Sequence, residues 1–176
     1  LGVPRPPIRL VSRNDGIHAV GTEDPTMDKT DALRDYAFDV SGQLSDVSGY
    51  ILKKDSPSCG MERVRVFDKN NVPAKTGSGI YAATLMECQP NLPFEEEGRL
   101  MDPVLRENFI ERVFIYYRWQ QMLIDGLSPA ALVDFHSRHK FNVLAHDEPA
   151  YRRLGRLVAD AGKEHLASLA GRYIDI

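Results

Sequence analysis

The stretch that decides the fold runs from Tyr50 to Gly60 and reads YILKKDSPSCG. Its apolar start predicts a short strand, which leads into a tight loop that carries a single cysteine, Cys59. Pro57 fixes its own φ angle and pushes Ser56 toward an extended conformation, while Gly60 allows the backbone to turn directly after the thiol. The sequence therefore predicts that Cys59 is presented at the end of a strand.

Two lysines, Lys53 and Lys54, precede this loop, and their positive charges favour the thiolate form of Cys59. A thiolate binds metals or attacks electrophiles, whereas a lone cysteine in a loop is more often an ordinary small side chain. The residues by themselves leave both interpretations open.

Helix and strand signals around the loop predict an α/β half. A helix followed by an apolar strand that ends in a functional loop is typical of a βαβ arrangement, in which sites gather at the carboxyl ends of strands. The expected elements are a strand at 8–11, a loop at 12–21, a helix from 30 to about 47, a strand at 50–53, a weak strand at 61–67, a polar turn at 68–75 and a helix from 80.

The segment Gly77-Ser78-Gly79 opens the last of these helices, so its backbone N–H groups could face an anion or a polar edge of a substrate. Two glycines before a helix are more often plain loop chemistry, and no dinucleotide or Walker fingerprint is completed here. A pocket wall at this segment is the functional interpretation.

Residues 89–102 are expected to be a linker, because their prolines and glycine break both helical and strand periodicity. The run Glu95–Glu97 within it reads as a solvated charge cluster rather than a metal site. Asp102 followed by Pro103 is a strong helix start, and Gly126 is the matching stop. Further helices are expected from Ser128 to about 145, over 148–161, and from 163 toward 173.

Three histidines, His136, His139 and His146, lie near one stripe of the second of these helices. His136 and His139 could share a metal, but His139 and His146 are roughly 10 Å apart along the axis at 1.5 Å per residue. A metal site would need carboxylates from another helix, and the alternative is buried or interhelical hydrogen-bonded histidines.

A local basic zone near these histidines could receive phosphate, which makes nucleotide or RNA binding the alternative function for the helical half. Acidic neighbours such as Asp134 and Glu148 weaken its field. The zone consists of Arg138, Lys140, Arg152, Arg153 and Arg156.

The composition, with 176 residues of which 43% are hydrophobic and 27% charged, allows one good core or two small ones. The net charge of −3 gives no general case for nucleic-acid binding. No run approaches the roughly 20 apolar residues that span a bilayer, so we expect a cytoplasmic protein with no membrane partner. Two distant cysteines suit a reducing compartment, with Cys88 as an inert residue near a helix end.

The string YILKKDSPSCG, together with VPRPPIRLV at 3–11 and TGSGIYAATL at 76–85, resembles the bacterial iron-sulfur thiouracil desulfidase family. Further on, RENFIERVFIYYRWQQMLIDGLSPAALVDFHSRHKFNVLAHD at 106–147 resembles the helical YbgA-type domain that is often fused behind that domain. The resemblance implies an α/β domain at 1–88, Rossmann-like with a mostly parallel sheet and incomplete at its N-terminus, a linker at 89–102, and an all-α helical bundle domain at 103–176.

By that resemblance the intact protein converts a small thiolated base, thiouracil, to uracil and sulfide without net redox change. Cys59 would be a ligand of a 4Fe-4S cluster, Ser56 would hydrogen-bond the substrate or the attacking water, and Ser58 is a weaker candidate for the same pocket. No oligomeric state is implied.

The chain departs from the family in one respect. Two further cysteine motifs and an acidic residue normally lie before the Pro-Arg segment, and neither occurs in this sequence. One thiolate cannot hold a cuboidal cluster by itself, so we expect no bound cluster and no desulfidase activity from these 176 residues alone.

Overall fold

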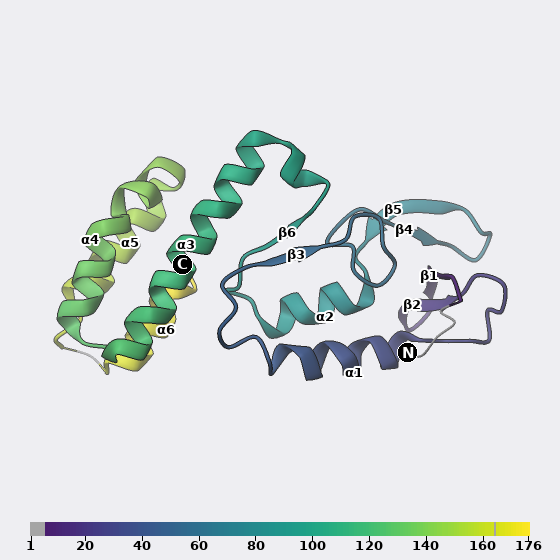
Figure 1. Cartoon of the computed structure of the whole chain (residues 1–176), viewed down its shortest axis with the longest axis horizontal. Coiled ribbons are helices and arrows are strands. Elements are labelled where there is room, and N and C mark those ends of the chain that lie inside the picture. Colours follow the sequence, from purple (N-terminus) through teal and green to yellow (C-terminus); the bar gives the residue numbers. More distant parts are fainter. Residues whose placement is uncertain (1–5, 164) are drawn as a thin grey trace. The chain divides into compact units, whose positions relative to one another are not determined.

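The computed structural model describes residues 6–163 and 165–176 and divides the chain into two compact units, 1–110 and 111–176 (Figure 1). Sheets and two helices make up most of the first unit, and the second is helical. The expected order of an α/β half followed by an all-α half is therefore confirmed. Among the described residues no helix combines the length and the apolar character needed to cross a membrane.

A four-stranded sheet in the order β2-β1-β4-β5 forms one part of the first unit. Its strands are β1 (Ile8–Arg13), β2 (Gly16–Gly21), β4 (Val64–Phe67) and β5 (Pro73–Gly77). Leu10 of β1 is fully buried and lies between Ala19 of antiparallel β2 and Val66 of parallel β4. The sheet is thus built around the middle of β1.

The expectation of a mostly parallel sheet is wrong, since β1 pairs with β2, and β4 with β5, in antiparallel fashion. Both pairs are hairpins closed by short polar turns, which only antiparallel strands allow. Gly16, which begins β2 directly after the first turn, has a φ angle of +137°. In the second turn the Asp68 carboxylate accepts hydrogen bonds from the N–H groups of Asn70 and Val72. These hairpins replace the loop and the polar turn expected at 12–21 and 68–75.

A separate pair of parallel strands, β3 (Tyr50–Leu52) and β6 (Phe94–Glu96), aligns Tyr50 with Phe94 and Leu52 with Glu96. β6 and the short 3₁₀ helix η1 (Arg99–Met101) lie inside the segment that was expected to be a linker. The solvated charge cluster expected at Glu95–Glu97 is wrong for two of its three members, because Glu95 and Glu96 are only 6% and 3% exposed.

Helices α1 (Thr30–Ser41) and α2 (Ile80–Cys88) pack against each other (Figure 1). Leu33 and Ala37 of α1 and Leu85 of α2 are buried in this contact region of the unit. α1 ends before the expected residue 47, since Gly42 disfavours helix and the following residues make turn-type bonds to carbonyls three residues back.

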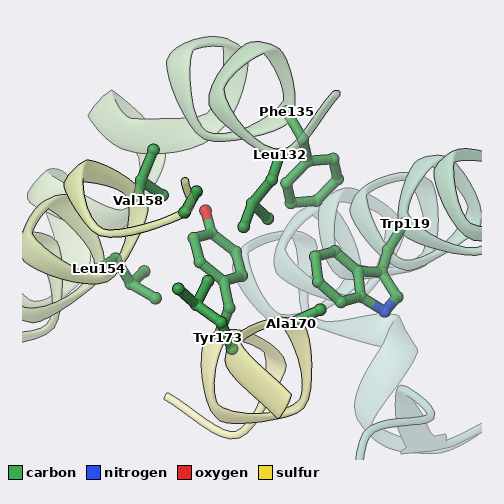
Figure 2. Close-up of a cluster of buried hydrophobic side chains, with 9 residues drawn as sticks. Trp119, Leu132, Phe135, Leu154, Val158, Ala170 and Tyr173 are labelled. Carbon is green, nitrogen blue, oxygen red and sulfur yellow. The ribbon is translucent and has the colours of Figure 1, made fainter. Parts of the chain in front are cut away.

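The helical unit contains α4 (Pro129–His146), α5 (Glu148–Ala159), α6 (Leu166–Ile174) and the C-terminal part of α3 (Pro103–Gly126). Its core is aromatic (Figure 2). The Trp119 ring stacks on Tyr173 at 5.5 Å between centroids and meets the edge of Phe135 at 5.2 Å. Leu132, Leu154 and Val158 fill the space around these rings, as Figure 2 shows.

Candidate functional site

The loop that follows β3 folds into a compact turn around Cys59. The Gly60 N–H donates to the Ser56 carbonyl at 2.8 Å, and the Cys59 N–H donates to Ser56 Oγ at 3.1 Å. Ser56 Oγ lies 3.1 Å from Ser58 Oγ, which lies 3.3 Å from the Cys59 sulfur. Two hydroxyls and one half-buried thiol therefore form a single hydrogen-bonded chain after the carboxyl end of β3.

The backbone of this turn tolerates little change. A Cβ atom at Gly60 would lie 2.3 Å from a methyl of Val64 and 2.8 Å from the Ser56 carbonyl oxygen. Asp55 and Arg63, on either side of the turn, have φ angles of 55° and 58°. A left-handed non-glycine residue costs of the order of 1–3 kcal/mol, so the surroundings must hold this conformation in place.

The first turn of α2 provides part of that support. The N–H groups of Gly79, Ile80 and Ala82 donate to the carbonyls of Gly60, Pro57 and Ser58 at 2.8, 3.2 and 3.0 Å. Since these N–H groups bond the loop itself, they do not face an anion. The start of α2 therefore supports the Cys59 loop through backbone hydrogen bonds.

Gly79 is glycine for a packing reason, because a Cβ there would lie 2.4 Å from the Ser58 carbonyl group. Gly77 ends β5 and faces the Val66 side chain, and Ser78 lies between the two glycines. The segment predicted as a pocket wall thus contacts the Cys59 loop through Gly79.

Carboxylates from the end of β6 hold the loop on its other side. Glu96 Oε1 accepts the Met61 N–H at 2.8 Å, and Glu97 Oε2 accepts the Lys54 N–H at 2.7 Å. Glu97 also pairs with Lys53 at 2.7 Å, and the hydrogen bond and charge of Glu97 raise the Lys53 pKa. Lys53 therefore serves Glu97 rather than the thiol, and sequence reasoning missed both glutamates.

A cavity of about 380 Å³ opens beside the two serines. This volume falls within the range of roughly 300–1,000 Å³ that is typical of small-molecule sites. Its wall is mostly apolar, with Ser56, Ser58 and Lys29 as the polar lining residues. The lining residues are Pro6, Pro7, Ile8, Met27, Lys29, Leu33, Ser56, Pro57 and Ser58.

Sequence reasoning identified the serine side of this cavity and missed the side formed by Met27, Lys29 and Leu33. Leu33 belongs to the apolar stripe of α1 and could have been recognised as core-facing, but no local signal marks residues 27 and 29. Neither Cys59 nor the Gly77–Gly79 segment is among the lining residues of this cavity.

Two tyrosines lie close to the loop. The hydroxyl of Tyr50, on β3, is 2.8 Å from that of Tyr81, on α2. Burial raises the pKa of Tyr81, and the hydrogen bond to Tyr50 and the charge of Cys59 act in the same direction. Tyr81 therefore stays protonated and ties β3 to the helix on which the loop sits.

The ligand set of a metal cluster is not complete in the described part of the chain. No group of three His, Cys, Asp or Glu side chains there could hold a metal ion. Cys59 and Cys88 are both free thiols, and Cys88 ends α2 whereas the loop docks on its first turn. A cuboidal iron-sulfur cluster needs several thiolates, so these residues offer it one ligand and no more.

The histidines of the helical unit are held as structural groups. His136 Nδ1 lies 3.1 Å from the Tyr173 hydroxyl, and the buried His139 ring packs 4.6 Å from Phe135. Burial lowers the pKa of both His136 and His139. His146 is exposed, 3.9 Å from Glu111. Among the described residues no group of three potential ligands could hold a metal here, and His136 is a hydrogen-bonded histidine, whereas the buried Nε2 of His139 has no hydrogen-bond partner.

Ion pairs reduce the charge of the predicted basic zone. Arg138 pairs with Asp134 at 2.8 Å, and Arg152 pairs with Glu148 at 2.5 Å. Both pairs link residues four apart on exposed helix faces. Such pairs are common on solvated helices, and they offset two of the five positive charges of the zone.

Comparisons with known proteins show which family the chain belongs to. The model of the 2-thiouracil desulfurase family matches residues 1–97, which include the Cys59 loop, α2 and β6. The uncharacterised protein YbgA of Escherichia coli (strain K12) is 45% identical over 49 residues, which are 28% of this chain and 29% of that protein. No solved structure matches. Since the family model covers more than half of its residues, the chain belongs to the 2-thiouracil desulfurase family.

Proposed function

We propose that the full-length protein removes sulfur from a thiolated pyrimidine base, converting thiouracil and water to uracil and hydrogen sulfide. The C=S group becomes C=O, and no electrons are gained or lost overall. The cavity beside Ser56 and Ser58 carries the proposal, since it lies within the range matched by the family and has the size of a small-molecule site.

The two sides of the cavity have different roles in this proposal. Ile8, Leu33 and Pro57 offer apolar contacts to the faces of a flat ring. The Ser56 and Ser58 hydroxyls bond to each other, Ser56 Oγ also accepts the Cys59 N–H, and Ser58 Oγ also contacts the thiol, so each hydroxyl can still make one hydrogen bond to the base or to the attacking water. The loop thereby fixes the edge of the base relative to Cys59.

Cys59 enters the proposal as one ligand of the 4Fe-4S cluster that the family resemblance implies. The described residues do not complete the ligand set, so we derive no step through the cluster and propose that these 176 residues alone bind none. Two free thiols suit a reducing compartment, and we place the reaction in the cytoplasm.

The test compares two substitutions in the full-length, anaerobically prepared protein. Cys59→Ala should abolish both iron retention and thiouracil turnover, because a ligand sets cofactor occupancy. Ser56→Ala should keep the iron and lower turnover, since a lost hydrogen bond of about 1–3 kcal/mol corresponds to roughly 5- to 150-fold in rate.

Cys88→Ala is the matched control and should keep both iron and activity. The proposed site is wrong if Cys59→Ala retains full iron and full activity. A colourless, iron-free wild-type protein after reconstitution would instead contradict the cluster chemistry.

A further inference from the structure

We propose that Glu96 and Glu97 are positioning residues that set the exposure of Cys59 by holding the two ends of its loop. The loop leaves the β3–β6 pair after Leu52, which lies opposite Glu96. From there it is held at Lys54, before the turn, by Glu97, and at Met61, after the turn, by Glu96. We call these two contacts the carboxylate clamp.

The clamp acts where the backbone has no strand partner. β3 ends at Leu52 and β4 begins at Val64, so Lys54 and Met61 lie in the connection between them. Without Glu96 the part-buried Met61 N–H would need another acceptor, because unpaired backbone N–H groups are rarely tolerated away from water, whereas the exposed Lys54 N–H could turn to solvent. Glu96, the last residue of β6, and Glu97, which follows it, accept these two N–H groups and fix where the loop starts and ends.

The clamp also borders the two left-handed residues of the connection. Asp55 follows Lys54 directly, and Arg63 comes two positions after Met61. Both conformations store strain that a free loop would release by rotating. Fixing the N–H groups of Lys54 and Met61 opposes that release, so the turn that presents Cys59 persists.

The two contacts differ in environment. Glu96 is 3% exposed, and a charge-assisted hydrogen bond at such a site is little screened by solvent. The Glu97 side chain is 38% exposed and shares its charge with the 72% exposed Lys53. We therefore expect the Glu96 contact to contribute more than the Glu97 contact.

A second link steadies the end of the loop after Cys59. Arg99 Nε donates to the buried Glu95 carboxylate at 2.7 Å, and Arg99 Nη1 donates to Glu62 at 2.5 Å. Glu62 directly follows Met61, so both residues after the turn are tied to the β6 region. The arrangement explains why three successive glutamates follow Phe94.

The importance of the clamp for catalysis rests on the proposed function, but its geometry can be tested without any turnover. The experiment measures iodoacetamide alkylation of the 176-residue chain by peptide mass spectrometry at one fixed pH. Cys59 is the reporter thiol, and Cys88 is an internal control on the same molecule.

Glu96→Leu should raise the Cys59 rate by fivefold or more, while the Cys88 rate stays unchanged. Glu96→Gln keeps an oxygen acceptor for the Met61 N–H and should restore most of the wild-type behaviour. Glu97→Leu should change the Cys59 rate by about twofold. Glu23→Leu removes an exposed carboxylate elsewhere in the unit and should change neither thiol.

Equal acceleration of both thiols in Glu96→Leu and Glu97→Leu would show that the glutamates only stabilise the unit, which overturns the proposal. An unchanged Cys59 rate in both variants overturns it as well. If Glu96→Leu fails to fold, Glu97→Leu still decides, since it must affect Cys59 without affecting Cys88, while Glu96→Gln must leave both thiols near their wild-type rates. If Glu96→Leu affects Cys59 specifically but the full-length protein releases no sulfide from thiouracil, the proposed function is rejected and the carboxylate clamp is still supported.

Discussion

The two units of this chain are stabilised in different ways. In the α/β unit the Cys59 loop is held by single polar contacts, each between a backbone group and a glycine-rich helix entry or a glutamate far along the chain. In the helical unit large rings pack on one another, and the buried histidine His136 bonds a ring hydroxyl.

The two kinds of contact differ in how sensitive they are to small displacements of the atoms. A hydrogen bond is lost within a few tenths of an ångström, whereas an aromatic cluster shares its energy over many weak contacts. The α/β unit is therefore the place where small changes alter a site, and the helical unit is the place where only large changes matter.

The largest expected effect is in the helical core. Trp119→Ala removes a side chain that is 4% exposed and stacked on Tyr173, and it should lower the free energy of unfolding of this unit by about 3–5 kcal/mol. Urea denaturation followed by far-UV circular dichroism measures the loss. Tyr117→Ala, a 50% exposed aromatic two residues away on α3, should cost far less. Similar losses for both would contradict an aromatic core around Trp119.

A smaller change should have a sharper local effect in the α/β unit. Gly79→Ala places a Cβ 2.4 Å from the Ser58 carbonyl group, and we expect a loss of about 1–3 kcal/mol together with a displaced Cys59 loop. Amide hydrogen exchange of residues 56–60 and the alkylation rate of Cys59 measure the displacement. Gly155→Ala is the control, because no atom lies within 4 Å of the added Cβ. An unaffected loop in Gly79→Ala would show that the packing of the loop on α2 is unimportant.

As the pH falls, the two units should begin to lose stability at different pH values. Burial opposes ionisation of Asp28, but hydrogen bonds from Thr30 and His18 outweigh it and lower the Asp28 pKa from 3.8 to about 2. The resulting stabilisation is present above pH 3.8 and is lost as the pH falls through about 2. Asp28→Asn should remove this dependence from the α/β unit, as measured by unfolding at pH 2–5.

In the helical unit the loss begins at higher pH. Burial lowers the pKa of His136 and His139 below 6.5. Below pH 6.5 the unfolded chain therefore binds more protons than the folded unit, and the free energy of unfolding falls. The fluorescence of Trp119, the single tryptophan of the chain, reports this unit alone. A flat stability between pH 7 and 4, unaffected by His139→Gln, would show that these histidines are not buried in neutral form.

Local signals were sufficient for the features that local chemistry controls. Ser56, Pro57 and Gly60 predicted the turn that presents Cys59, and the glycine before Ile80 predicted the start of α2. Asp102-Pro103 and Gly126 bound α3 as expected. Each of these predictions depends on residues within a few positions of one another.

Contacts between distant residues account for what the sequence did not reveal. β6 is three residues long and contains two glutamates, so its pairing with β3, more than 40 residues earlier, leaves no periodic pattern. For the same reason the run Glu95–Glu97 read as a solvated cluster. The partner of His136, Tyr173, likewise lies 37 residues away on another helix. The roles of the predicted site residues in catalysis stay predictions.

The outer strand of the main sheet affects how copies of this chain behave in concentrated solution. β5 lies at an edge of the four-stranded sheet, where unpaired backbone groups invite a second molecule to add its own strand. The strand begins with Pro73, which has no N–H to donate, and carries the charged Lys75 in an exposed stretch. Proline and lysine at an edge both discourage such pairing, so β5 protects the sheet from self-association into aggregates.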